Sequence, residues 1–265
     1  MIKQHEPIKK RYLKFILFNF ITFCSLKVRF IISNHYSISA LNETALLVSF
    51  ENVIDETINE KVIALHNAFA ADFFPGFIET VPAYSSLAVF YDPFTIKKYH
   101  REGTAFDLVK KHAEQLLSSL QITTPQQETE IISVPVHYNG EDLEEVAMLH
   151  GISMEELVKI HSQRPYRVFM IGFLPGFAYM GKLDERIATP RKKSPRQQVS
   201  AGSVGIAGYQ TGIYPFTSPG GWQLIGQTPL KIFDKAMTDP CLFKAGDSIQ
   251  FISISKEEFE KQNEY

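Results

Sequence analysis

Hydrophobic residues recur at helical spacing in two stretches of the first half of the chain. In the first stretch, 55–73, intervals of three and four residues separate Ile58, Val62, Leu65, Phe69 and Phe73. In the second, 104–120, similar intervals separate Phe106, Val109, His112, Leu116 and Leu120. Residues at this spacing share one face of a helix. The pattern therefore predicts two amphipathic helices, each with one face directed at a core.

Four short runs rich in β-branched and aromatic residues flank these helices, and they read as strands at 44–50, 77–83, 86–91 and 129–136. Pro75-Gly76 ends the first helix, and Asp92-Pro93 breaks the third strand. The predicted order is strand, helix, strand, strand, helix, strand. Two helices on one face of a four-stranded antiparallel sheet form a ferredoxin-like domain, which we expect over residues 36–136.

The next segment, 137–165, predicts two short helices that connect two domains. Gly151 suits the end of the first helix, and the capping box Ser153-Met-Glu-Glu156 opens the second. A helix, a glycine turn and a helix are also typical of DNA-binding proteins. The second helix carries Glu155 and Glu156 against Lys159, and a net acidic helix would repel phosphate. We therefore expect no nucleic-acid binding.

The composition changes after a predicted strand at 166–171. Eleven of the fifteen glycines lie between Gly172 and the C-terminus, and short β-prone runs alternate with glycine and proline. Many short strands with such turns are typical of a barrel or sandwich. We predict an α+β protein, with a β-barrel domain over 166–256 and a frayed tail at 257–265.

Residues 1–35 differ from the rest of the chain. They hold seven lysines and arginines against one acid, Glu6, and an apolar run of ten residues at 15–24. Three interpretations stay open: a start site assigned too early, a tail or membrane-surface segment, and an export signal. The run is too short for a membrane span, which needs about 20 residues. We expect an extension outside the fold.

The overall charge and the cysteines narrow the class of protein. The net charge is −2, which points to neither nucleic acid nor a membrane surface. Cys24 and Cys241 stand far apart in the sequence, so a disulfide framework is not indicated. A reducing, cytoplasmic compartment is the default expectation.

The sequence lacks the strong autonomous catalytic motifs. It has no G-x-x-x-x-G-K-[ST] loop for ATP, no G-x-S-x-G elbow and no H-E-x-x-H metal motif. The glycines of 205–212 do not have dinucleotide-binding spacing. The chain therefore looks incomplete as a stand-alone enzyme, and we expect no metal site.

Polar and aromatic residues are interleaved with the glycines between Gly172 and Gly226. Glycines let backbone N–H groups approach an anion, arginine grips a carboxylate or phosphate, and aromatic rings supply flat walls. We expect an anionic, partly flat ligand here. The binding candidates are His161, Tyr179, Arg191, Arg196, Gly202, Ser203, Gln210 and Tyr214. Candidates for partner contacts are Phe173, Pro175, Phe177 and Trp222. No catalytic residue is assigned.

Structural interpretations stand beside these. The glycines and prolines also suit simple turns, and the basic stretch 191–196 also suits a solvated loop. His161 lies at a predicted helix end, where it would cap the last carbonyls. Phe173 and Phe177 also suit a core or a partner contact.

The run 166–183 (YRVFMIGFLPGFAYMGKL) resembles the signature of the family of 5-oxoprolinase B subunits, also named allophanate hydrolase subunit 1 and the KipI kinase inhibitors. The stretches 188–191, 201–208, 210–215 and 218–230 look like its continuation, and 81–87 and 142–147 also match. The resemblance runs from 36 to 254. The chain departs from the usual pattern at Ala178, where Pro is common, and at Tyr209, where a small residue is common.

The resemblance implies a ferredoxin-like domain followed by a cyclophilin-like β-barrel, and one component of a complex rather than a solitary enzyme. Together with the A and C subunits of 5-oxoprolinase, family members open 5-oxo-L-proline to L-glutamate using ATP. It implies that ATP is shared with the C subunit, the direct partner. Two alternatives stay open: a KipI-type inhibitor of sensor histidine kinase autophosphorylation, and a subunit of a urea carboxylase/allophanate hydrolase system.

Overall fold

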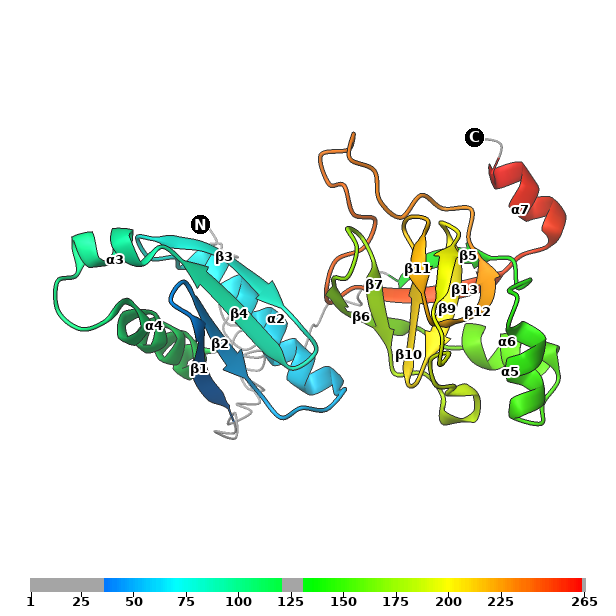
Figure 1. Ribbon diagram of the computed structural model, residues 1–265, viewed down its shortest axis with the longest axis horizontal. Helices are drawn as coiled ribbons and strands as arrows, with labels where there is room; N and C mark the ends of the chain where they lie inside the picture. Colours follow the sequence, from blue (N-terminus) through cyan, green and yellow to red (C-terminus); the bar gives the residue numbers. More distant parts are fainter. Residues whose placement is uncertain (1–35, 121–130, 264–265) are drawn as a thin grey trace, which may run out of the picture.

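The computed structural model describes residues 36–120 and 131–263. The three interpretations of residues 1–35 lie outside the described residues. The first lobe holds a four-stranded antiparallel sheet in the order β1-β2-β4-β3 (Figure 1). Its strands are β1 (Ser37–Asn42), β2 (Ala45–Ser49), β3 (Phe77–Pro82) and β4 (Ser86–Tyr91). Its helices are α2 (Glu56–Ala71), α3 (Pro93–Tyr99) and α4 (Ala105–Ser119).

The two long helices confirm the prediction made from hydrophobic spacing. Asp55 caps α2 by accepting a hydrogen bond from the backbone N–H of Ile58, and Thr104 forms a capping box with Asp107 at the start of α4. The apolar faces of both helices pack with the sheet in one core. Phe73 was expected on this buried face, but it lies beyond the last residue of α2 and is exposed.

The strand predicted at 129–136 does not belong to this sheet. The observed strand, β5 (Ile131–Val136), pairs in parallel with β13 (Ser248–Ser253) in the second lobe, where Val134 and Val136 are buried. The fourth strand of this sheet is instead β1, which the sequence analysis did not predict. It pairs with β2 through a tight turn in which the Asn42 side chain accepts a hydrogen bond from the backbone N–H of Thr44. A short hairpin closes at a smaller entropic cost than a long return of the chain. The ferredoxin-like arrangement predicted for 36–136 is not confirmed.

The second lobe is a nearly closed, barrel-like sheet of seven strands in the order β12-β9-β10-β7-β6-β13-β5, consistent with a cyclophilin-like fold. Two hydrogen bonds of 2.9 Å between His137 and Gln227 bridge its outermost strands, β5 and β12. Its further strands are β6 (Tyr166–Ile171), β7 (Ala178–Gly181), β9 (Ser203–Ala207), β10 (Gln210–Ile213) and β12 (Gln223–Gln227). Because β5 completes the sheet, the barrel begins well before the predicted boundary at 166.

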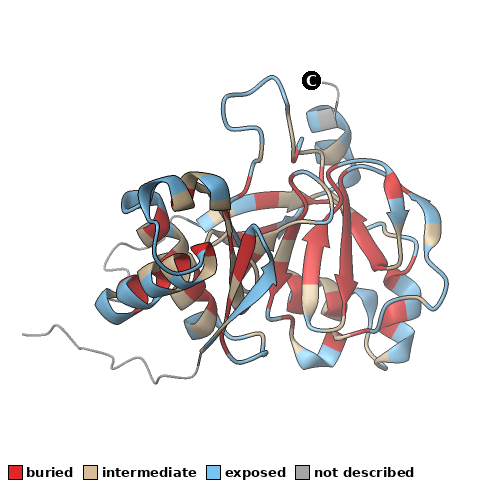
Figure 2. Cartoon of the chain, turned by 60° about the vertical axis from the view of Figure 1, so that its left-hand side comes forward, coloured by how far each residue is buried: buried red, intermediate tan, exposed pale blue. Residues whose placement is uncertain are grey.

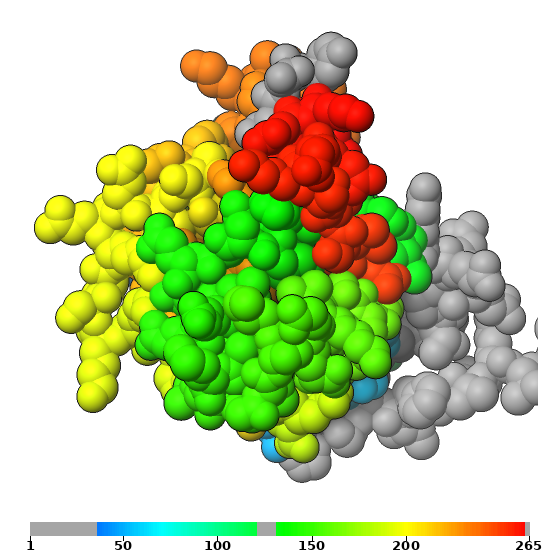
Figure 3. Space-filling view, turned by 90° about the vertical axis from the view of Figure 1, so that its right-hand side faces the viewer, coloured from blue at the N-terminus to red at the C-terminus, as the bar shows by residue number. Residues whose placement is uncertain are grey.

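Smaller elements surround the barrel. A two-stranded ribbon pairs β8 (Arg196–Val199) with β11 (Ser218–Gly220), and η1 (Glu185–Ile187) is a short 3-10 helix. The predicted connection contains α5 (Leu143–Leu149) and α6 (Met154–Ser162). Figure 3 shows these two helices in green on one face, with the C-terminal helix in red above them. This last helix, α7 (Lys256–Asn263), replaces most of the frayed tail expected at 257–265.

The strands of the barrel carry the buried residues, and the helices expose their outer sides (Figure 2). Among the helices of 36–120 and 131–263, none has the length and apolar character needed to cross a membrane.

His161 joins α6 to the interior of the barrel. Tyr138 Oη donates to its Nδ1 at 2.8 Å, and its Nε2 donates to Thr211 Oγ1 at 2.9 Å, which in turn donates to the Gly205 carbonyl. The ring is fully buried and stacks on Phe251. Burial lowers the pKa of His161 to about 3, so the imidazole is neutral. Both ring nitrogens of His161 are used inside the core, and its role in ligand binding stays a prediction.

This neutral histidine makes stability depend on pH. Its pKa is lower in the folded chain than the value of about 6.5 for an unfolded one. The unfolded state therefore binds the extra proton, and stability falls as pH decreases from about 6.5 towards 3, by about 1.4 kcal/mol per pH unit. In urea unfolding at several pH values, His161→Gln should remove this slope. His66→Gln is the control: burial lowers the pKa of this half-buried histidine too, so its loss should remove a smaller part of the slope. An equal loss of slope in both variants would contradict the assignment.

Candidate functional site

Glycines on the outer face of β9 and β10 make room for aromatic rings. A Cβ at Gly205 would lie 3.1 Å from the Cβ of Trp222, and one at Gly212 would lie 3.1 Å from Trp222 Cζ3 and 3.2 Å from Phe177 Cζ. All three distances are tighter than ordinary packing, and a Cβ at Gly212 would also lie 2.8 Å from the Ala178 carbonyl, so a larger residue would displace the rings and the backbone. These glycines therefore serve packing, not the approach of an anion to backbone N–H groups.

Four aromatic side chains cover this face, and we call them the aromatic face: Phe177, Tyr179, Tyr214 and Trp222. The Phe177 ring lies 4.8 to 5.4 Å from each of the other three, measured between ring centroids. Phe177, Tyr214 and Trp222 are buried, whereas Tyr179 is half-buried. Phe177 and Trp222 pack inside this chain, and their contact with a partner stays a prediction.

Phe173 and Pro175 remain accessible at the edge of the aromatic face. The Phe173 side chain is 63 % exposed and meets Phe177 edge-on, and Pro175 is also exposed. Phe173 has φ of 68°, the left-handed region that a bulky residue rarely adopts. Such strain persists only where the surroundings impose it, and it clusters at functional sites. The partner role of these two residues stays a prediction.

Arg191 supplies the positive charge of the site. Its guanidinium carbon lies 5.8 Å from the centre of the Trp222 ring, within the range of a cation–π interaction. The residue is exposed, and within 36–120 and 131–263 it forms no ion pair with a carboxylate. Burial raises the pKa of Tyr179, and the charge of Arg191 opposes that rise. The structure thus places two of the predicted binding candidates, Arg191 and Tyr179, close to each other.

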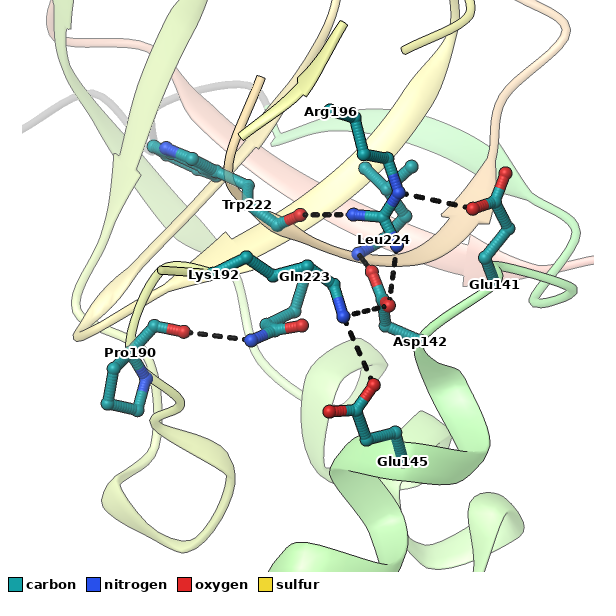
Figure 4. A network of polar contacts seen from close by, with 9 residues as sticks. All are labelled: Glu141, Asp142, Glu145, Pro190, Lys192, Arg196, Trp222, Gln223 and Leu224. Atoms are coloured by element: carbon teal, nitrogen blue, oxygen red, sulfur yellow. Dashed lines mark hydrogen bonds and ion pairs between the residues drawn. The ribbon is translucent and has the colours of Figure 1, made fainter. Parts of the chain in front are cut away.

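A buried carboxylate fixes the loop that carries Arg191 (Figure 4). Asp142 is 2 % exposed, and its Oδ1 accepts from Arg196 Nη2 at 2.6 Å and from Lys192 Nζ at 2.7 Å. Its Oδ2 accepts from the backbone N–H of Leu224 at 2.7 Å. Burial pushes the pKa of Asp142 upward, but the hydrogen bonds from Arg196 and Lys192 outweigh it and hold the pKa below its usual value. This set is called the Asp142 network.

The Asp142 network reaches both sides of Arg191. The Lys192 backbone N–H donates to the Gly221 carbonyl at 2.7 Å, and Gln223 Nε2 donates to the Pro190 carbonyl at 3.0 Å. Arg196 also pairs with Glu141 at 3.1 Å. Arg196 therefore pairs with the buried Asp142 and the exposed Glu141 of its own chain, and its role in ligand binding stays a prediction. Its place in the fold positions Arg191.

Tyr214 lies in the aromatic face within electrostatic reach of Arg191, but Gly202, Ser203 and Gln210 do not gather there with it. Gly202 has φ of 79° in a turn, where its N–H donates to the Tyr214 carbonyl, and Ser203 is buried at the start of β9. Gln210 pairs with Ala207 at the far end of that strand, so four residues, or about 13 Å, separate it from Ser203. In this fold Gly202 forms a turn and Tyr214 packs in the aromatic face, and their role in binding stays a prediction. Ser203 and Gln210 cannot share one small ligand with each other.

One aromatic residue near the site was missing from the predicted set. Tyr84, in the turn between β3 and β4, stacks on Phe169 with ring centroids 5.5 Å apart and meets Tyr179 edge-on at 6.1 Å. The stretch 81–87 matched the family pattern, and this was the signal that could have marked it. Among the described residues there is no group of three or more His, Cys, Asp or Glu side chains that could hold a metal ion.

The Asp142 network predicts a large loss of stability when its central charge is removed. Asp142→Asn leaves Lys192 and Arg196 without their buried partner, so we expect urea unfolding to show a loss of about 3 kcal/mol. Trp222 is the only tryptophan, and its emission should shift as the loop loosens. Glu145→Gln is the control, because this carboxylate is 66 % exposed and its pair with Lys192 should contribute at most about 0.5 kcal/mol. Equal losses in both variants would refute the network's role.

Comparisons with known proteins agree with this architecture. Residues 36–243 match the family model "Carboxyltransferase domain, subdomain C and D". The chain is 43 % identical to the 5-oxoprolinase B subunit of Bacillus subtilis (strain 168) over 86 % of this chain and 97 % of the relative. It is 35 % identical to the 5-oxoprolinase B subunit of Escherichia coli O157:H7, over 80 % and 93 % of the two chains.

Among solved structures, the crystal structure of TTHA0988 superposes with a TM-score of 0.69 at 33 % identity, covering 80 % of this chain. This chain spans only 40 % of that protein. The Kluyveromyces lactis urea amidolyase, at 19 % identity and a TM-score of 0.65, shares the fold over 85 % of this chain and 15 % of its own length. Because the family model covers most of the fold and the curated relatives match along nearly their whole length, this chain belongs to the family of 5-oxoprolinase B subunits.

Proposed function

We propose that the chain is the non-autonomous B component of a cytoplasmic, ATP-dependent 5-oxoprolinase that opens 5-oxo-L-proline to L-glutamate with the A and C subunits. The observation that carries the proposal is Arg191, an exposed cation over the Trp222 ring with no carboxylate partner among the described residues. A flat cyclic acid suits this pairing of a positive charge with aromatic walls. The names of the relatives support the choice of acid.

The chemistry explains why ATP and a second protein are needed. Hydrolysis of a lactam is slow because the leaving amine stays tethered to the carbonyl. Phosphorylation of the amide oxygen makes the carbonyl carbon a better electrophile. In this proposal Arg191 and Tyr179 hold and orient the acid, while ATP binds at the boundary with the C subunit. The exposed residues Phe173 and Pro175 meet that partner.

Arg191 is tested in the assembled enzyme. The chain is co-expressed with the A and C subunits, and ATP-dependent glutamate release is measured. Arg191→Ala should lower kcat/KM about ten- to hundredfold, since a hydrogen bond to a charged group contributes about 1.5–3 kcal/mol. Arg186→Ala is the matched control: this arginine is also exposed, but Asp184 and Glu156 pair with it.

The assay also separates the alternatives. Wild-type activity in Arg191→Ala would remove Arg191 from the site. An assembled complex that releases no glutamate, together with inhibition of sensor histidine kinase autophosphorylation by this chain, would favour the kinase inhibitor. ATP-dependent turnover of urea or allophanate, in place of 5-oxo-L-proline, would favour the urea-linked system.

The interface is tested by charge insertion at an exposed ring. Phe173→Asp should abolish co-purification with the C subunit, because burying a carboxylate in an apolar contact is costly. The melting temperature should stay at or above that of the wild type, since the ring is exposed and the position strained. Phe94→Asp is the control: this ring is more exposed still, but it lies in α3 of the first lobe. Loss of co-purification in both variants would refute a specific contact.

A further inference from the structure

The hydroxyl group of Tyr84 is buried without a hydrogen-bond partner. Such a group costs free energy, because it gives up its hydrogen bonds to water and receives none in return. Phenylalanine would fill the same space without this cost. Among the described residues, only Tyr166 Oη and Gln223 Oε1 share this state. A hydroxyl that burdens the fold calls for an explanation outside the fold.

The position of the hydroxyl suggests that explanation. The Tyr84 ring lies between Phe169 of β6 and Tyr179 of β7, and Tyr179 leads on to Trp222 and Arg191. Burial raises the pKa of Tyr84 strongly, Tyr179 adds to the rise, and the charge of Arg191 opposes it. The hydroxyl therefore keeps its proton and is a donor within electrostatic reach of Arg191.

The two lobes hold Tyr84 firmly in this place. Asn59 of α2 is fully buried, and its Nδ2 donates to the Phe169 carbonyl at 2.9 Å. Its Oδ1 accepts from Arg167 Nε at 2.9 Å. Weaker bonds of 3.3 Å from Asn59 Nδ2 reach the carbonyls of Ala83 and Tyr84 themselves. One buried amide thus ties the turn that carries Tyr84 to the strand on which its ring stacks.

We propose that Tyr84 is a substrate-binding residue, whose hydroxyl donates to the carboxylate of the cyclic acid that pairs with Arg191. The identity of the acid rests on the proposed function. The hydroxyl is closed to solvent, so the side chains packed around it must move before a carboxylate can reach it. Tyr84 belongs to the first lobe, so this lobe supplies one wall of the site. The candidates predicted from the sequence all lie in the second lobe.

The same surroundings favour a carboxylate over a triphosphate. Triphosphates are held by several free backbone N–H groups. Here aromatic rings fill the space above Gly205 and Gly212, so the backbone of these glycines is not open to a phosphate. One guanidinium and one hydroxyl suit a single carboxylate.

Tyr84→Phe tests the proposal, because it removes only the hydroxyl and keeps the ring. The emission of Trp222, the only tryptophan, is followed as the full chain is titrated with 5-oxo-L-proline or with 2-pyrrolidinone, the same lactam without the carboxylate. We expect saturable binding of 5-oxo-L-proline and no binding of 2-pyrrolidinone. Tyr84→Phe should weaken it about ten- to hundredfold, with a melting temperature equal to or above that of the wild type.

Tyr166→Phe is the matched control. Tyr166 Oη is also buried without a partner, but the residue lies in the barrel core against His161 and Phe251. Tyr166→Phe, like Tyr84→Phe, should have a melting temperature equal to or above that of the wild type. Unlike Tyr84→Phe, it should bind the acid as the wild type does. In the complex with the A and C subunits, Tyr84→Phe should raise the KM for 5-oxo-L-proline about tenfold or more and leave the KM for ATP unchanged.

The outcomes separate this inference from the proposed function. An active complex in which Tyr84→Phe has the wild-type KM for the acid would overturn the role of Tyr84 alone. So would wild-type binding of the acid by Tyr84→Phe, or a wild-type chain that binds neither compound. A complex that releases no glutamate, while Trp222 reports Tyr84-dependent binding of the acid, would overturn the proposed function and support the inference.

Discussion

The buried carboxylate of Asp142 is the interaction on which the site depends. It lies before α5 and accepts hydrogen bonds from Lys192, Arg196 and the backbone of Leu224. Three segments far apart in the sequence thereby meet at one charge: the two-helix connection, the basic loop and β12. An uncompensated buried charge is costly, so each segment must keep its place for the others to be stable. Because Lys192 and Arg196 belong to the same loop as Arg191, these contacts also fix the position of Arg191.

The glycine-rich composition of the barrel has its main cause in ring packing. Gly205 and Gly212 face outward because their neighbours Val204, Ile206 and Ile213 fill the interior. The outer surface of the barrel would normally be solvated, but the missing side chains form a depression into which Phe177 and Trp222 pack. The result is a second small core outside the first, and it gives Arg191 a rigid aromatic surface to lie on.

Local patterns predicted local structure well. The helices α2 and α4 follow from hydrophobic spacing and caps, and both are signals contained in one short stretch. The partner of β5 and the edge strand β1 could not be predicted, because both depend on which segments meet in three dimensions. The candidate site shows the same division. Tyr179 and Arg191 lie together as predicted, but Arg196 and His161 are drawn inward by Asp142, Tyr138 and Thr211, and polarity alone does not reveal an internal partner.

Phe173 and Tyr84, both beside the aromatic face, break the local rules without any benefit to the fold that the structure shows. Phe173 holds a left-handed backbone to present an exposed ring, and Tyr84 buries a hydroxyl with no acceptor. Natural sequences mostly agree across levels of structure, and functional sites are where such conflicts are expected, so each of these two positions is a candidate for a functional role. Both residues border the aromatic face, one at its outer edge and one from the opposite lobe. Each of these two residues lowers the stability of the fold, which is expected where a ligand or a partner protein supplies the missing contacts.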